Sequence, residues 1–199
     1  MPKMKTKFWN IMKNEEENSA DMILYGTIGS DEWWDDICDK TFKEDIANLG
    51  EVENINLHIN SPGGSVFAAV AIANTLKNHK AKVTAFIDGL AASAATIITS
   101  ACDVVKMPKN ALFMIHNPSM IAMGDSEEMR KQADVLEKYK NSITETYLQK
   151  VNIDKEKLSE LMDNETWLNA EEALEYGFID EIIENTDIQV VENKVISNN

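Results

Sequence analysis

The fold is set by the stretch Ile55-Asn56-Leu57-His58-Ile59-Asn60-Ser61-Pro62-Gly63-Gly64. Its first six residues alternate between apolar and polar side chains, the period of two expected of a strand with one buried face. Ser61-Pro62-Gly63-Gly64 then breaks the strand. The apolar residues that follow recur at helical spacing: Val66, Phe67, Val70, Ala73 and Leu76. The stretch therefore predicts a strand–turn–helix unit.

A second unit of the same kind follows along the chain. It has a strand over Lys82–Ile87, a turn at Gly89-Leu90-Ala91-Ala92-Ser93, and a helix from Ala94 to about Ser100. Two such units in succession predict neighbouring parallel strands joined by right-handed crossovers. The predicted fold class is therefore α/β, built from repeated ββα (strand–turn–helix) units.

Local signals predict further elements on both sides of these units. They are a strand over Met22–Thr27, a loop over Gly29–Asp36, a helix over Thr41–Leu49, one or two strands between Asp103 and Ile115 broken at Pro108, and helices over Ser126–Lys150 and Lys155–Met162. A last helix is well marked, because Asn169 and Glu172 form a capping-box pattern and Gly177 stops it.

The helix over Ser126–Lys150 has a narrow apolar stripe, since Met129, Leu136 and Ile143 recur every seven residues. Such a helix predicts a protruding arm that packs on a second subunit. The predicted organisation is a polar, loosely held N-terminal arm over residues 1–20, one domain over 21–185 with a handle over about 117–150, and a tail over 186–199.

The composition excludes several classes of protein. A formal net charge of −15 over 199 residues argues against nucleic-acid binding, which needs clustered Lys and Arg. Cys38 and Cys102 cannot form a disulfide framework, and no metal-ligand spacing accompanies them.

The basic start is followed at once by the acidic run Glu15–Glu17, which leaves no signal-peptide core. Val83–Cys102 carries Asp88 and several hydroxyls, which disfavours a membrane span. We expect a cytoplasmic protein with no membrane partner.

The chain has three histidines, and a serine nucleophile would need one of them as its base. His79 lies in a polar turn, which is typical of a solvated side chain. His58 shares the polar face of its strand with asparagines, and its position favours a structural role. His116 ends an apolar strand beside Asn117-Pro118, where catalytic loops gather. A lone histidine is more often structural, so the interpretation of His116 depends on its partners.

Ser93 is the candidate nucleophile because it lies at a strand-to-helix turn among small residues. Gly89 and the neighbouring alanines let backbone approach the serine, and helix N-terminal amides favour negative charge. The alternative is a tightly packed Ala/Ser helix. Gly63-Gly64 allows backbone amides to point into a cleft, as an oxyanion hole requires, although a plain turn would look the same.

Taken together, in order and spacing, three motifs resemble the proteolytic subunit of the Clp protease. They are Asn60-Ser61-Pro62-Gly63-Gly64-Ser65, Gly89-Leu90-Ala91-Ala92-Ser93-Ala94-Ala95 and Met114-Ile115-His116-Asn117-Pro118. The stretch Trp167–Gly177 also resembles that family, so the resemblance covers about Ile23–Ile183. It implies a ClpP/crotonase-type fold with a protruding handle helix, and a serine endopeptidase that forms an acyl-enzyme with no cofactor or metal.

The resemblance assigns roles residue by residue. Ser93 matches the family's nucleophile, His116 its base, and the amides of Gly64 and Ala94 its oxyanion hole. Two acids precede Trp167. Asp163 is the predicted third member of the triad, if the chain is about two residues shorter before Trp167 than the common bacterial form. Glu165 is the alternative.

A substrate is expected to lie extended between the glycine turn and the handle. Its backbone would pair with Gly64–Phe67 and with the segment near Met120–Gly124. The predicted substrate-binding residues are Gly63, Ser65, Val66, Phe67, Met120 and Ile121.

Several features differ from the housekeeping subunit. Ala94 replaces the usual methionine, residues 119–124 lack a glutamine-rich pattern, and Asn164 stands where many members have a charged inter-ring residue. With Phe8-Trp9-Asn10 and Met162–Trp167, these features resemble Clp-type proteases of phages and prophages, which are associated with capsid (prohead) maturation. The expected partners are a polypeptide substrate, further copies in a heptameric ring or stacked rings, and either phage capsid proteins or an AAA+ unfoldase, as in the housekeeping alternative.

Two other classes share this fold type. Crotonases use a similar oxyanion hole to stabilise thioester enolates of acyl-CoA, and a non-catalytic relative would serve as a ring scaffold. Neither class needs a serine–histidine pair, so Ser93 and His116 argue against both.

Overall fold

The structure is a computed structural model that describes residues 7–29 and 37–184. Its strands are β1 (Trp9–Asn14), β2 (Ser19–Tyr25), β3 (Asn54–Ser61), β4 (Lys82–Ala92), β5 (Val104–Pro108), β6 (Leu112–Ile115), β7 (Thr166–Leu168) and β8 (Glu181–Ile183). Its helices are α1 (Ile37–Leu49), α2 (Val66–Lys77), α3 (Ala94–Thr99), α4 (Ser126–Leu148), α5 (Lys155–Asp163) and α6 (Ala170–Glu175).

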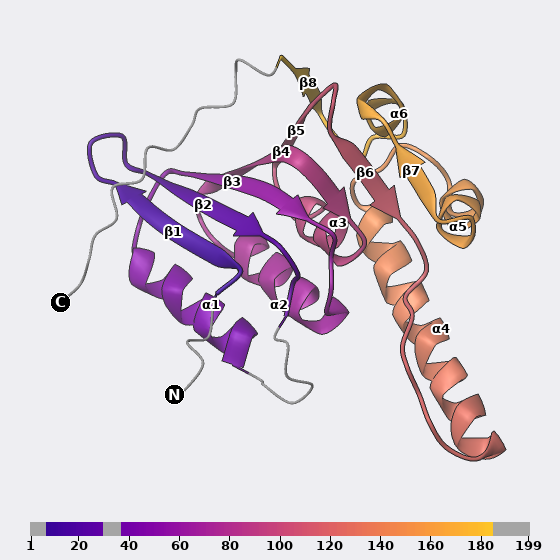
Figure 1. The fold of residues 1–199 in the computed structure, drawn as a ribbon. Coiled ribbons are helices and arrows are strands. Elements are labelled where there is room, and N and C mark those ends of the chain that lie inside the picture. The colour runs from indigo at the N-terminus through magenta and orange to yellow at the C-terminus, as the bar shows by residue number, and fades with distance from the viewer. Residues whose placement is uncertain (1–6, 30–36, 185–199) are drawn as a thin grey trace.

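The eight strands found in the described residues form one sheet, which confirms the α/β fold class (Figure 1). The main path runs β1-β2-β3-β4-β5-β8, while β6 pairs with β4 and β7 with β6. Strands β2 to β5 are parallel neighbours, as the two strand–turn–helix units predict. Figure 1 shows α1, α2 and α3 on one face of the sheet. Ile55, Leu57 and Ile59 of β3 are completely buried, and burying such side chains contributes about 1.5–3 kcal/mol each.

Strand β4 continues beyond its predicted end at Ile87 and reaches Ala92. Thr84–Phe86 pair with β5, whereas Leu90–Ala92 pair with Leu112–Met114 of β6. The long strand β4 therefore pairs first with β5 and then with β6. The turn after β4 is consequently placed beside the end of β6.

The N-terminal segment is part of the sheet and is not a loosely held arm. Strand β1 pairs antiparallel with β2, and Trp9 is buried. The Trp9 indole donates to the Asp45 carboxylate at 2.9 Å and packs edge-on against Phe42, both on α1. The predicted arm is therefore wrong for residues 9–20, because buried Trp9 anchors them. Residues 1–6, the predicted loop at 30–36 and the predicted tail over 186–199 lie outside the described residues.

Helix α4 projects from the body of the molecule, as predicted, and the chain after β6 runs back along it (Figure 1). Asp125 is its N-cap and forms a capping box with Glu128. Its buried residues, Ile143, Thr144 and Tyr147, all lie in its last third. None of the helices in the described part of the chain has the length and hydrophobicity to cross a bilayer.

Candidate active site

Ser93 occupies a strained turn between β4 and α3. Its φ and ψ angles are 55° and −124°, and such a conformation costs a non-glycine residue about 1–3 kcal/mol. The turn is held from both sides, because the Ser93 N–H donates to the Met114 carbonyl at 2.9 Å and the Thr96 hydroxyl donates to the Ser93 carbonyl at 2.6 Å. A serine displayed on a strained strand-to-helix turn is typical of a nucleophile.

Helix α4 supports this turn from behind. The Thr96 hydroxyl proton is directed to the Ser93 carbonyl, so the Tyr147 hydroxyl donates to Thr96 Oγ1 at 2.6 Å. Burial raises the pKa of Tyr147 to about 12. The tyrosine therefore stays protonated and keeps its hydrogen to donate.

His116 is brought to Ser93 by the strand register. It directly follows β6, whose residue Met114 lies opposite Ala92 of β4. The distance from Ser93 Oγ to His116 Nε2 is 2.7 Å, a hydrogen bond of good length. The predicted serine–histidine pair therefore meets in the fold.

Within the described part of the chain, Glu165 supplies the carboxylate in ion-pair range of the other ring nitrogen. Strands β6 and β7 are antiparallel with Ile115 opposite Thr166, so the next opposed positions are His116 and Glu165. Glu165 Oε2 lies 3.7 Å from His116 Nδ1, within ion-pair range but longer than a hydrogen bond. Catalytic contacts are often this loose before substrate binds.

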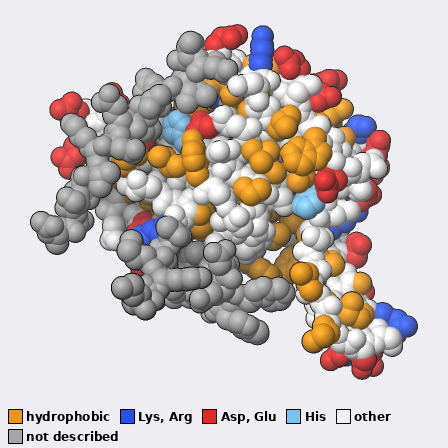
Figure 2. All heavy atoms as spheres, viewed as in Figure 1, with side chains coloured by type: hydrophobic (Ala, Val, Ile, Leu, Met, Phe, Trp, Pro, Cys, Tyr) orange, Lys and Arg blue, Asp and Glu red, His pale blue; other side chains and the backbone are white. Residues whose placement is uncertain are grey.

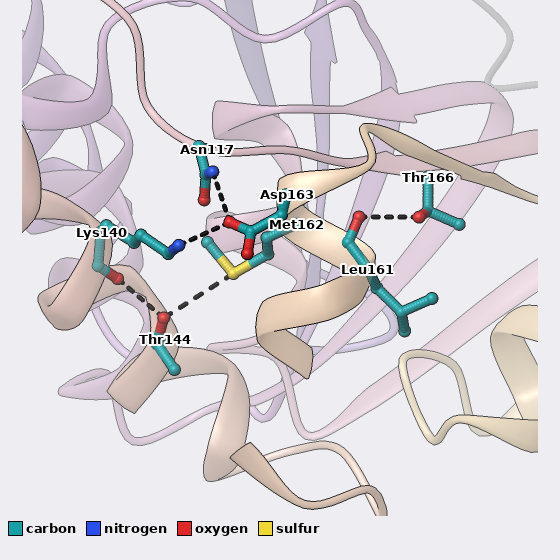
Figure 3. A network of polar contacts seen from close by, with 7 residues as sticks. All are labelled: Asn117, Lys140, Thr144, Leu161, Met162, Asp163 and Thr166. Atoms are coloured by element: carbon teal, nitrogen blue, oxygen red, sulfur yellow. Dashed lines mark hydrogen bonds and ion pairs between the residues drawn. The ribbon is translucent and has the colours of Figure 1, made fainter. Parts of the chain in front are cut away.

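Asp163, the acid predicted to orient His116, makes its contacts with other residues. Asp163 is the last residue of α5, so its side chain follows the helix surface and not the strand. Its carboxylate accepts hydrogen bonds from Lys140 at 2.5 Å and from Asn117 at 2.8 Å (Figure 3). These two hydrogen bonds, that of Lys140 first, lower the pKa of Asp163. The alternative from the sequence, Glu165, has the geometry for the role.

The glycine turn packs directly on the nucleophile turn. A side chain at Gly63 would place its Cβ 2.6 Å from the Ala92 carbonyl oxygen and 2.7 Å from Ser93 Cβ, and the φ of Gly63 is 94°. Only glycine fits such a conformation without strain. The close approach brings the backbone of this turn alongside Ser93.

The backbone amides predicted to bind the oxyanion are those of Gly64 and Ala94. Ile28 forms two backbone hydrogen bonds with the glycine turn: its N–H donates to the Gly63 carbonyl, and its carbonyl accepts the Ser65 N–H. The Gly64 N–H takes part in neither bond. Ala94 is the first residue of α3, and N–H groups of a first turn have no intrahelical acceptor. Ala94 directly follows Ser93, and Gly64 directly follows the glycine that packs on the Ser93 turn.

The predicted substrate-binding residues divide into two groups. Ser65 belongs to the group engaged in the fold, since its N–H donates to the Ile28 carbonyl and its hydroxyl caps α2.

Val66 and Phe67 begin α2, so their helical backbone cannot pair with a substrate as a strand would. Their side chains remain available, and Phe67 is exposed and packs edge-on against Tyr139. Met120 and Ile121 are exposed in a segment that is not a strand.

The other two histidines have partners away from Ser93. His58 Nδ1 lies 3.1 Å from the Asp88 carboxylate, and its ring stacks on Phe86. His79 Nδ1 accepts the Ala81 N–H at 3.0 Å. Both contacts fit the structural and surface roles predicted for these residues.

Comparison with known protein sequences identifies the family of this chain. The Clp protease family model matches residues 9–186. ATP-dependent Clp protease proteolytic subunits of Streptococcus pneumoniae strains Hungary19A-6, CGSP14 and 70585 are each 36% identical over 140 residues, which cover 68% of this chain and 71% of the relative. The chain therefore belongs to the Clp protease family and is a serine endopeptidase.

Proposed function

We propose that Ser93, His116 and Glu165 form the catalytic triad of this endopeptidase. Ser93 Oγ attacks the peptide carbonyl carbon while His116 Nε2 takes its proton. His116 then gives that proton to the departing amine, and water hydrolyses the acyl-enzyme by the same route. The observation that carries the proposal is the 2.7 Å contact between Ser93 Oγ and His116 Nε2.

Glu165 fixes the state of the histidine in this proposal. A carboxylate facing Nδ1 favours the tautomer with its proton on Nδ1, which leaves the Nε2 lone pair for the serine proton. It also stabilises the imidazolium that forms during attack. The oxyanion is bound by the Gly64 and Ala94 amides, which a low-dielectric site makes more effective than in water.

The substrate is a polypeptide held by side chains around this site. Phe67, on the glycine side, and Met120 and Ile121, on the handle side, are exposed hydrophobic groups. Figure 2 shows hydrophobic side chains along the projecting arm, which consists of α4 and the chain that runs beside it. Met123 and Met129, from this part of the chain, are exposed. We propose that this arm packs on further copies of the chain in a heptameric ring or in stacked rings.

The biological role we propose is maturation of phage capsids, on the resemblance of Phe8-Trp9-Asn10, Ala94 and Met162–Trp167 to phage and prophage enzymes. The second candidate is a housekeeping proteolytic subunit that works with an AAA+ unfoldase. It is favoured by the name of the Streptococcus pneumoniae relatives, ATP-dependent Clp protease proteolytic subunit.

Cleavage of β-casein, an unfolded polypeptide, tests the endopeptidase and separates the two roles. We expect the purified assembly to fragment casein without nucleotide, and the Ser93→Ala variant to leave it intact. Absence of cleavage of both casein and a short fluorogenic peptide by the wild-type assembly would refute the proposed triad. Degradation of a folded protein with an unstructured tail, accelerated by a Clp-type unfoldase and ATP, would favour the housekeeping role over the phage role.

Ser61 gives a prediction about the oxyanion turn. It is fully buried, donates to the Gly26 carbonyl at 2.6 Å and accepts the Gly63 N–H at 3.1 Å. Ser61→Ala leaves both groups unpaired, so we expect the free energy of unfolding to fall by about 1–3 kcal/mol. The loosened turn also misplaces the Gly64 amide, so kcat should fall while KM changes little. Urea unfolding and peptide hydrolysis measure the two effects.

The control for Ser61 is Ser142→Ala, an exposed position on α4. We expect its free energy of unfolding to stay within about 0.5 kcal/mol of wild type. Unchanged stability and kcat in Ser61→Ala would show that the hydroxyl does not hold the turn.

A further inference from the structure

We propose that Asp163 and Lys140 are positioning residues for His116 and act through Asn117. The proposal rests on the proposed catalytic role of His116. It gives Asp163 a function that differs from the triad role predicted from the sequence.

The end of α5 holds the backbone on both sides of the catalytic pair. The Met162 carbonyl accepts the Asn117 N–H at 3.2 Å and the Glu165 N–H at 3.3 Å. Asn117 directly follows His116, and Glu165 is the carboxylate beside His116. One carbonyl at the end of a helix therefore sets the separation of the base and its acid.

Side-chain contacts add to these two backbone hydrogen bonds, and helix α4 contributes Lys140 and Thr144 to them (Figure 3). Asp163 Oδ1 accepts hydrogen bonds from Asn117 Nδ2 at 2.8 Å and from Lys140 Nζ at 2.5 Å. The hydroxyl of Thr144, one turn after Lys140, contacts Met162 Sδ at 3.7 Å. The same end of α5 is thus fixed to α4 by an ion pair and by packing.

The Asn117 side chain depends on Asp163 for its orientation. Asn117 Oδ1 is buried and has no hydrogen-bond partner within the described part of the chain. Turning the amide over would bury its NH₂ group at that place and set its oxygen against the Asp163 carboxylate. Each change costs about 1–3 kcal/mol of unmet hydrogen bonding. Asp163 is therefore the group that holds this amide, and with it the residue next to His116.

Loss of this support should reduce catalysis without changing how substrate binds. A displacement of about 1 Å from a productive geometry can cost about 100-fold in rate. We expect Asp163→Ala and Lys140→Met each to lower kcat for a short fluorogenic peptide by about 10- to 100-fold, with KM within about twofold of wild type. Asp163→Glu keeps the charge and should restore part of the loss.

The chain offers a matched control for the α4–α5 ion pair. Lys155 of α5 pairs with Glu145 of α4 at 3.1 Å, and this ion pair includes neither His116 nor Asn117. Lys155→Met removes an ion pair between the same two helices, so we expect its kcat to match wild type. The double variant Asp163→Ala/Lys140→Met should lose no more than the worse single variant, because both residues act through one link.

The outcomes separate this proposal from the proposed triad. An inactive wild-type enzyme would refute the triad. An active wild type with full kcat in both Asp163→Ala and Lys140→Met would refute only the positioning role. The positioning role would also be refuted if Lys155→Met lost as much kcat as Lys140→Met. The same holds if Asp163→Ala and Lys140→Met raised KM and left kcat unchanged. Thermal unfolding of each variant confirms that the chain remains folded in the assay.

Discussion

Replacing Ser93 with alanine is expected to lower kcat for peptide cleavage by about 10⁴- to 10⁶-fold. No other hydroxyl is placed on His116 Nε2 among the contacts of the described residues. Without the nucleophile, only the oxyanion donors and substrate binding remain to assist attack by water. Hydrolysis of a fluorogenic peptide, followed over hours to reach slow rates, measures the loss.

The folded state should survive this change, because alanine fits wherever the serine side chain fits. A matched control is Ser100→Ala at the other end of α3, which removes a hydroxyl bonded to the Thr96 carbonyl. We expect its kcat to stay within a few-fold of wild type. A Ser93→Ala enzyme with wild-type turnover would place the nucleophile elsewhere.

Replacing Glu165 with glutamine is expected to give the second largest loss, about 10²- to 10⁴-fold in kcat. Glutamine keeps the size of the side chain but removes the charge that stabilises the imidazolium. Its amide can also favour the wrong histidine tautomer. Glu165→Asp should retain more activity than Glu165→Gln, because it keeps the charge.

Asp163 provides the comparison that makes this prediction specific. The loss in Glu165→Gln should exceed the loss in Asp163→Ala, since Glu165 faces the ring and Asp163 does not. Wild-type kcat in Glu165→Gln, together with a loss of about 10⁴-fold in Asp163→Ala, would return the triad role to Asp163.

The sequence predicts the centre of the fold because its signals there are local. The alternation over Ile55–Asn60 and the two glycine- and serine-containing turns correctly place β3, α2, α3 and the first part of β4. The capping box of Asn169 and Glu172 and the stop at Gly177 are also confirmed, since a cap needs only neighbouring residues. These elements bring Ser93 and the glycine turn together.

The carboxylate that we propose as the third triad member is placed by an element that has no local signal. Strand β7 has three residues and exists only through its pairing with β6. That antiparallel register makes Glu165 face His116 and leaves Asp163 at the end of α5. A prediction based on the distance to Trp167 cannot distinguish two acids on opposite sides of a helix-to-strand transition.

Strand β1 is not predicted from the sequence, for a related reason. Glu15–Glu17 and the surrounding polar residues suggest an exposed arm, but the stretch is the turn of a hairpin. The decisive contacts are those of Trp9 with Asp45 and Phe42, more than 30 residues away in sequence. Long-range burial of this kind is not encoded in local periodicity.

Mapping a fluorophosphonate adduct on the wild-type enzyme tests the central claim most directly. The reagent phosphonylates an activated serine, and peptide mass spectrometry locates it. We predict an adduct on the peptide that contains Ser93, formed rapidly in wild type and much more slowly in His116→Ala. An adduct on another serine, or an active enzyme that forms none, would contradict the assignment of Ser93 and His116 as the catalytic pair.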